Sequence, residues 1–92
     1  MLTRKDEKRR ILCRDDIQKR LWKAGIKELG YESVLENIIT EWGFNLPGWE
    51  DIDGTIYYGF METINGKIYK SMYLTYVDAL AEEILFILEN EL

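Results

Sequence analysis

Residues 55–76, TIYYGFMETINGKIYKSMYLTY, decide the fold. Asn65-Gly66 lies in the middle of this stretch, with aromatic and aliphatic residues on both sides. An Asn-Gly pair between two strand-like runs favours a type I′ turn, because both positions of that turn need a positive φ. The stretch therefore predicts a β-hairpin in which Ile64 pairs with Lys67.

The turn also fixes which side chains of the predicted hairpin share a face. Counting outward pairs Glu62 with Tyr69, Phe60 with Ser71 and Tyr58 with Tyr73. One face then carries Ile56, Tyr58, Phe60, Ile64, Tyr69 and Tyr73. The other carries Tyr57, Met61, Ile68, Met72 and Leu74, together with Gly59, Thr63 and Lys70. Neither face is polar enough to be left in water, so we expect each to be covered.

Two helices are expected around this hairpin. Residues 31–42 place apolar side chains at helical spacing, and Gly43 ends the pattern. After the hairpin, Thr75 is a helix cap with Asp78 three residues on. The following helix has its main apolar stripe at Val77, Leu80, Ala81, Ile84, Ile87 and Leu88. Residues 45–54, NLPGWEDIDG, are predicted to be a loop, because Pro47-Gly48 and Asp53-Gly54 both favour turns.

The N-terminal part is helical by pattern from about residue 15 to Leu29, with Trp22 in its apolar stripe. Whether residues 1–14, a basic segment, are helical is left open. The chain is thus predicted to be one α+β domain spanning residues 1–92. It has two or three N-terminal helices, an Asn-Gly hairpin sandwiched by helices, and a C-terminal helix packed on the hairpin.

Composition indicates a small acidic cytoplasmic protein. The chain has 92 residues, a net charge of −5 and a single cysteine, Cys13, which excludes an internal disulfide and suits a reducing compartment. No apolar run approaches the roughly 20 residues of a membrane span. The charged N-terminus lacks a signal-peptide pattern, so we expect no export and no membrane partner.

The charge is divided unevenly along the chain. Residues 1–27 hold ten basic and four acidic residues, a net of +6, whereas residues 28–92 hold two basic and thirteen acidic residues, a net of −11. The basic end could contact nucleic acid or another acidic partner. Alternatively, it lies along the acidic body of its own molecule.

Catalysis is not expected. The sequence has no histidine, which removes the commonest general base and metal ligand. Cys13 has Arg10 and Arg14 as basic neighbours, but no base to make it a nucleophile. The EDIDG stretch at residues 50–54 does not fit a complete calcium loop. No catalytic residue, metal site or cofactor is therefore predicted.

Nucleic-acid binding is the alternative function. Its candidate contacts are Arg9, Arg10, Lys19, Arg20, Lys23 and Lys27. The order of three helices and a hairpin also matches a winged helix-turn-helix. However, the third helix of that arrangement would present Glu32, Glu36 and Glu41, which phosphate repels.

Protein binding is the favoured function. We expect the Met-rich face of the hairpin to meet the chain's own helices and the tyrosine-rich face to meet a partner, with a homodimer the expected assembly. The predicted protein-binding residues are Tyr58, Phe60, Tyr69, Tyr73 and Phe86.

Residues 35–90 resemble a type of short, uncharacterised protein from phages and mobile elements. The resemblance rests on a helix that ends in Trp-Gly, a β-hairpin, and the helix start Tyr-Leu-Thr-Tyr-Val-Asp-Ala-Leu at residues 73–80. It implies a phage or mobile-element accessory protein or inhibitor, of the anti-defence type. It transfers no catalytic residues.

Overall fold

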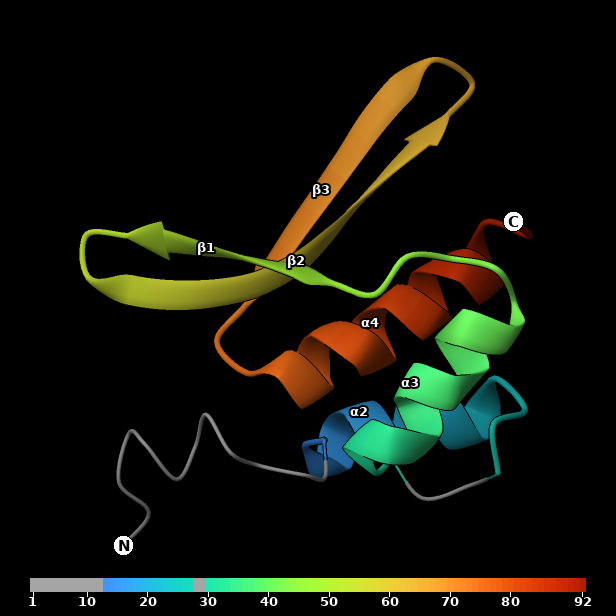
Figure 1. The fold of residues 1–92 in the computed structure, drawn as a ribbon. Coiled ribbons are helices and arrows are strands. Elements are labelled where there is room, and N and C mark those ends of the chain that lie inside the picture. Colours follow the sequence, from blue (N-terminus) through green and yellow to red (C-terminus); the bar gives the residue numbers. More distant parts are fainter. Residues whose placement is uncertain (1–12, 28–29) are drawn as a thin grey trace, which may run out of the picture.

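The computed structural model describes residues 13–27 and 30–92. They form helices α2 (Asp15–Lys23) and α3 (Glu32–Glu41), strands β1 (Gly48–Ile52), β2 (Thr55–Ile64) and β3 (Lys67–Tyr73), and helix α4 (Tyr76–Glu89). Helix α4 lies between the sheet on one side and α2 and α3 on the other (Figure 1). The predicted α+β class with a C-terminal helix packed on the sheet is confirmed. Most of the basic segment at residues 1–14 lies outside the described residues.

The hydrophobic core surrounds α4. Nine of the fourteen residues of this helix are buried, because it packs against the sheet and both other helices. The core cluster contains Cys13, Ile17, Leu21, Leu35, Ile39, Val77, Leu80, Ala81, Ile84 and Leu85. Trp22 does not belong to it, although the sequence pattern placed it in the apolar stripe. Helix α2 is only nine residues long and buries Ile17 and Leu21, which leaves Trp22 56% exposed.

The start of α4 is fixed by the cap that the sequence predicts. The backbone N–H of Asp78 donates to Oγ1 of Thr75 at 3.3 Å. The Asp78 carboxylate in turn accepts a hydrogen bond from the backbone N–H of Arg14 at 3.2 Å. The same helix end therefore receives the chain from β3 and holds the beginning of α2.

The sheet has three antiparallel strands in the order β1-β2-β3. Strand β1 pairs with the first half of β2, from Ile52 opposite Thr55 to Gly48 opposite Gly59. Strand β3 pairs with the second half, from Tyr58 opposite Tyr73 to Ile64 opposite Lys67. Only Tyr58 and Gly59 have partners on both sides, so the sheet opens into two ribbons that leave this point in different directions (Figure 1).

Both hairpins end in two-residue turns with positive φ. The values are 52° and 79° at Asn65 and Gly66, and 52° and 82° at Asp53 and Gly54, as a type I′ turn requires. The β2–β3 register contains the Phe60–Ser71 and other pairs that follow from such a turn. The prediction of a loop over residues 45–54 was wrong for β1. Asp53-Gly54 forms a hairpin turn, and this turn folds Gly48–Ile52 back onto β2 as a strand.

The tyrosine-rich face of the sheet is the one that packs on α4, which reverses the sequence prediction. Phe60 is 7% exposed, whereas Met61, Ile68 and Leu74 on the opposite face are 64%, 64% and 59% exposed. The turn fixes which residues share a face, but the short connection from β3 into α4 selects the face that meets the helix. The expected sandwich is also wrong for the described residues. Helices α2 and α3 pack on α4 and leave the second face of the sheet uncovered (Figure 1).

Candidate binding site

The five predicted protein-binding residues lie together and take part in the packing of the sheet on α4. They are Tyr58, Phe60, Tyr69, Tyr73 and Phe86. The ring of Phe86 on α4 lies 5.4 Å from that of Phe60 and 5.7 Å from that of Tyr69, measured between centroids. Tyr58 meets the Tyr76 ring edge-on at 5.7 Å. This aromatic layer therefore joins the sheet to α4. Phe60 is buried within it, whereas Tyr69 stays 37% exposed.

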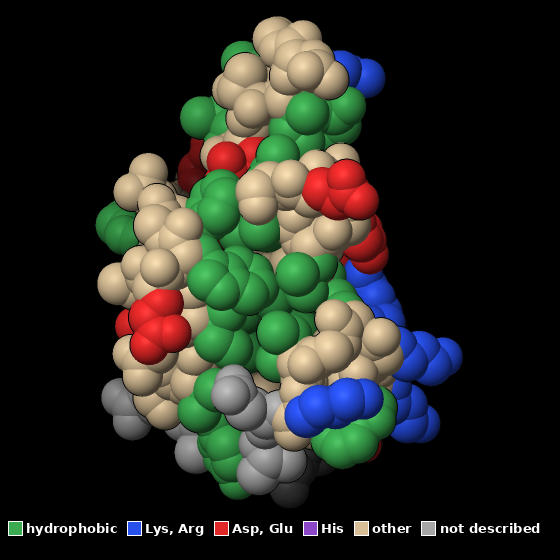
Figure 2. Space-filling view, turned by 90° about the vertical axis from the view of Figure 1, so that its right-hand side faces the viewer, with side chains coloured by type: hydrophobic (Ala, Val, Ile, Leu, Met, Phe, Trp, Pro, Cys, Tyr) green, Lys and Arg blue, Asp and Glu red, His purple; other side chains and the backbone are tan. Residues whose placement is uncertain are grey.

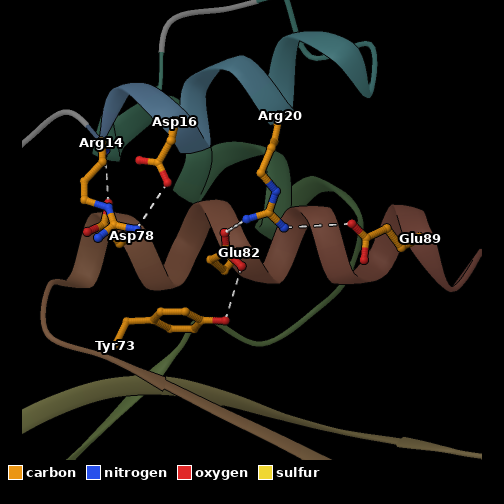
Figure 3. A network of polar contacts seen from close by, with 7 residues as sticks. All are labelled: Arg14, Asp16, Arg20, Tyr73, Asp78, Glu82 and Glu89. Atoms are coloured by element: carbon orange, nitrogen blue, oxygen red, sulfur yellow. Dashed lines mark hydrogen bonds and ion pairs between the residues drawn. The ribbon is translucent and has the colours of Figure 1, made fainter.

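The predicted nucleic-acid contacts are only partly free. Arg9 and Arg10 lie outside the described residues, and Lys19, Arg20 and Lys23 lie on α2. The Arg20 guanidinium donates to Glu82 and lies 3.9 Å from a carboxylate oxygen of Glu89, both on α4 (Figure 3). This geometry agrees with the interpretation in which basic residues lie against the acidic body of the chain.

Two further contacts engage charged groups near α2. Lys27 donates to the carbonyl oxygen of Trp22 at 3.1 Å, and its Nζ lies 4.3 Å from the centroid of the Trp22 ring. The hydroxyl of Tyr73 donates to Glu82 at 3.4 Å, which connects β3 to the Arg20 ion pair (Figure 3). Burial raises the pKa of Tyr73 above its ordinary value of 10.0.

A pocket of about 410 Å³ lies beside β2, around the point where its pairing with β1 ends. Its walls come from the loop after α3, the start of β1 and the middle parts of β2 and β3. The hydrophobic side chains around it are Phe44, Leu46, Trp49, Tyr57, Phe60, Met61 and Met72. Polar and charged side chains line it as well, and binding pockets commonly combine an apolar wall with such groups.

Hydrophobic side chains also gather on the side of the molecule that carries the loop after α3 and the end of α4. Figure 2 shows them as a continuous area below the tip of the β2–β3 hairpin. Leu46 in the loop is 41% exposed, and Leu92 after α4 is 45% exposed. This side of the molecule is therefore apolar over more than one element.

Glu83 of α4 contributes the unusual chemistry of this pocket. Its side chain lines the pocket, yet the residue is 0% exposed. Neither carboxylate oxygen has a hydrogen-bond partner among the described residues. Burial raises the pKa of Glu83 to about 7, and the negative charge of Glu62 contributes to the rise. Both the protonated and the ionised form of this carboxyl group are therefore accessible near neutral pH. It donates a hydrogen bond when protonated and attracts a cation when ionised.

Other charged groups surround the same pocket. Glu62 of β2 lies near enough to influence Glu83. Lys70 of β3 forms an ion pair with Glu50 of β1 at 3.2 Å, and both residues line the pocket. Because Lys70 already has this partner, it does not neutralise Glu83.

Tyr76, one residue after the cap of α4, responds to the same acidic environment. Burial raises its pKa to about 12, and the nearby charges of Glu36, Glu32 and Glu83 add to the rise. Carboxylates from α3 and α4 therefore both raise the pKa of Tyr76.

Glu83 was not identified from the sequence as a site residue. A signal was present, because α4 carries apolar residues on nearly all of its sides and contains two adjacent glutamates. A helix of this kind cannot expose both of them equally. Glu82 meets Arg20, and Glu83, about 100° further round the helix, is buried.

No family model, curated protein or solved structure matches the chain. Within residues 13–27 and 30–92, no group of three or more acidic or cysteine side chains is placed to hold a metal ion. None of the helices that the structure describes is long and apolar enough to cross a membrane.

Proposed function

We propose that this chain is a non-enzymatic protein-binding protein that contacts its partner through the uncovered face of the sheet. We call this surface the open face and define it by Tyr57, Met61, Ile68, Met72 and Leu74. The observation that carries the proposal is the exposure of Met61, Ile68 and Leu74, at 64%, 64% and 59%. Large apolar side chains grouped on one exposed surface mark interaction sites, and methionine and tyrosine are enriched in them.

A second copy of the chain is the first partner to test. Two antiparallel sheets can pack face to face about 10 Å apart, which would bury the open face of each copy. The resemblance to phage and mobile-element proteins favours another partner, a host protein that this chain inhibits. Both partners use the same surface, so variants of that surface test the proposal in either case.

The experiment compares the full chain with the double variant Met61→Glu, Ile68→Glu. Light scattering should give a dimer mass for the wild type and a monomer mass for the variant. If the wild type is monomeric, a host protein should copurify with it, bind the purified chain directly, and fail to bind the variant. Trp22→Glu, at an exposed apolar residue of α2, which packs on α4 and not on the sheet, is the matched control. The proposal would be refuted if the wild type is monomeric and binds no protein that the double variant fails to bind.

Nucleic-acid binding through α2 remains the alternative, and the ion pairs argue against it. Arg20 is engaged by Glu82 and Glu89, which removes one cation from the basic surface of α2. We therefore expect no tight duplex binding. A submicromolar gel shift at moderate salt that Lys19→Gln, Lys23→Gln abolishes would favour the alternative, because phosphate contacts depend on such cations.

A further inference from the structure

The pocket contains a buried acid without a partner in the described part of the chain. Glu83 is 0% exposed, and neither of its oxygens accepts a hydrogen bond there. A buried charge without hydrogen bonds is unfavourable, so a ligand that supplied donors would be held strongly. A group that donates one hydrogen bond to each oxygen of Glu83 would satisfy both acceptors.

The charges around the pocket select a cation. The ionisable groups that face Glu83 or line the pocket are Tyr57 and Glu62 from β2, Glu50 from β1, Lys70 from β3 and Tyr76 from α4. Lys70 is paired with Glu50. Glu62 and Glu83 therefore give the pocket a negative potential, which a low-dielectric wall strengthens.

The walls select a planar cation. Phe44, Trp49, Tyr57 and Phe60 surround the pocket with aromatic rings. A guanidinium group stacks on aromatic faces and donates two parallel hydrogen bonds to one carboxylate, whereas an ammonium group does neither as well.

We propose that the pocket binds an arginine side chain of the partner protein, with both oxygens of Glu83 accepting hydrogen bonds from its guanidinium group. This inference rests on the proposed function, because it assigns the chemistry of the partner. Leu46 and Met61 line the pocket and are 41% and 64% exposed, so their side chains can change rotamer when an arginine enters.

Arginine binding should become tighter as pH rises through neutrality, because the guanidinium pairs with the ionised form of Glu83. The raised pKa of Glu83, about 7, sets the midpoint. A bound guanidinium should in turn lower that pKa.

The test is an NMR titration of the full ¹⁵N-labelled chain with the capped tripeptide acetyl-Gly-Arg-Gly-amide. The same tripeptide with citrulline is the comparison, because citrulline keeps the shape of arginine and lacks its charge. At a pH above that of half-ionisation, the arginine peptide should shift the amide resonances of Phe60, Met61 and Glu83. It should bind about tenfold more tightly than the citrulline peptide.

Glu83→Gln should remove this preference, whereas Glu89→Gln, on the same helix outside the pocket, should keep it. Glu62→Gln, which leaves Glu83 intact, should weaken the preference. Equal binding of the two peptides, absence of pocket shifts at millimolar peptide, or an arginine preference that survives in Glu83→Gln would each overturn the inference. If the peptide test fails while Met61→Glu, Ile68→Glu still abolishes partner binding, only the arginine assignment is lost.

Discussion

Replacing Glu83 by glutamine should change how the stability of the protein depends on pH. In the wild type the pKa of Glu83 rises from 4.5 to about 7 on folding, because burial penalises the charged form. Below the lower pKa both states hold the proton, and burial carries no charge penalty. As the pH rises from 4.5 to about 7, Glu83 ionises in the unfolded chain before it does so in the folded protein, and the folded protein loses stability.

The magnitude follows from the shift in pKa. Each pKa unit corresponds to about 1.4 kcal/mol, so the shift lowers the free energy of unfolding by about 3 kcal/mol between pH 4 and pH 8. Glutamine has nearly the same shape and cannot ionise, so the variant escapes this loss. It still buries a polar amide, and the prediction therefore concerns the change with pH and not the stability at one pH.

The assay is urea unfolding followed by tryptophan fluorescence and circular dichroism, at several pH values across the window. The difference in unfolding free energy between Glu83→Gln and wild type should grow with pH by about 3 kcal/mol. Glu89→Gln, at an exposed glutamate of the same helix, is the control and should show no comparable growth. Parallel stability profiles for wild type and Glu83→Gln would refute the assignment of Glu83 as a buried, ionising acid.

Two further substitutions test the fold. A Cβ at Gly59 would collide with the backbone oxygen of Ser71, so Gly59→Ala should destabilise the protein by about 1–3 kcal/mol in the same urea assay. Gly48→Ala, where an added Cβ meets nothing within 4 Å, is its control, and equal effects of the two changes would contradict the close strand approach. Thr75→Ala removes the acceptor of the Asp78 N–H and should cost about 1 kcal/mol. An unchanged melting curve would show that the cap contributes little.

Features set by neighbouring residues in the chain could be predicted from the sequence. The helix cap at Thr75 depends on residues within one helical turn, and the α+β class follows from the order of the patterns. The pairing of Phe60 with Ser71 likewise depends on the local Asn-Gly turn. These signals are short-range, so a single sequence contains them.

Features set by contacts between distant segments could not be predicted. The Met-rich face was expected to meet the helices, and it is the exposed one. Both faces of the hairpin are apolar, and the sequence does not say which one meets α4. Strand β1 was missed because its five residues are all exposed and lack an apolar pattern. The pocket depends on three distant parts of the chain that meet at Glu83, namely the loop after α3, the middle of the sheet and α4.

The most direct test of the binding site is the ionisation of Glu83 itself. A ¹³C NMR titration of its side-chain carboxyl carbon, assigned by comparison with Glu83→Gln, measures this pKa in the intact protein. The structure predicts a midpoint of about 7, which Glu62→Gln lowers. A midpoint near 4.5, the ordinary value for a glutamate, would contradict a buried and unpartnered acid in the pocket.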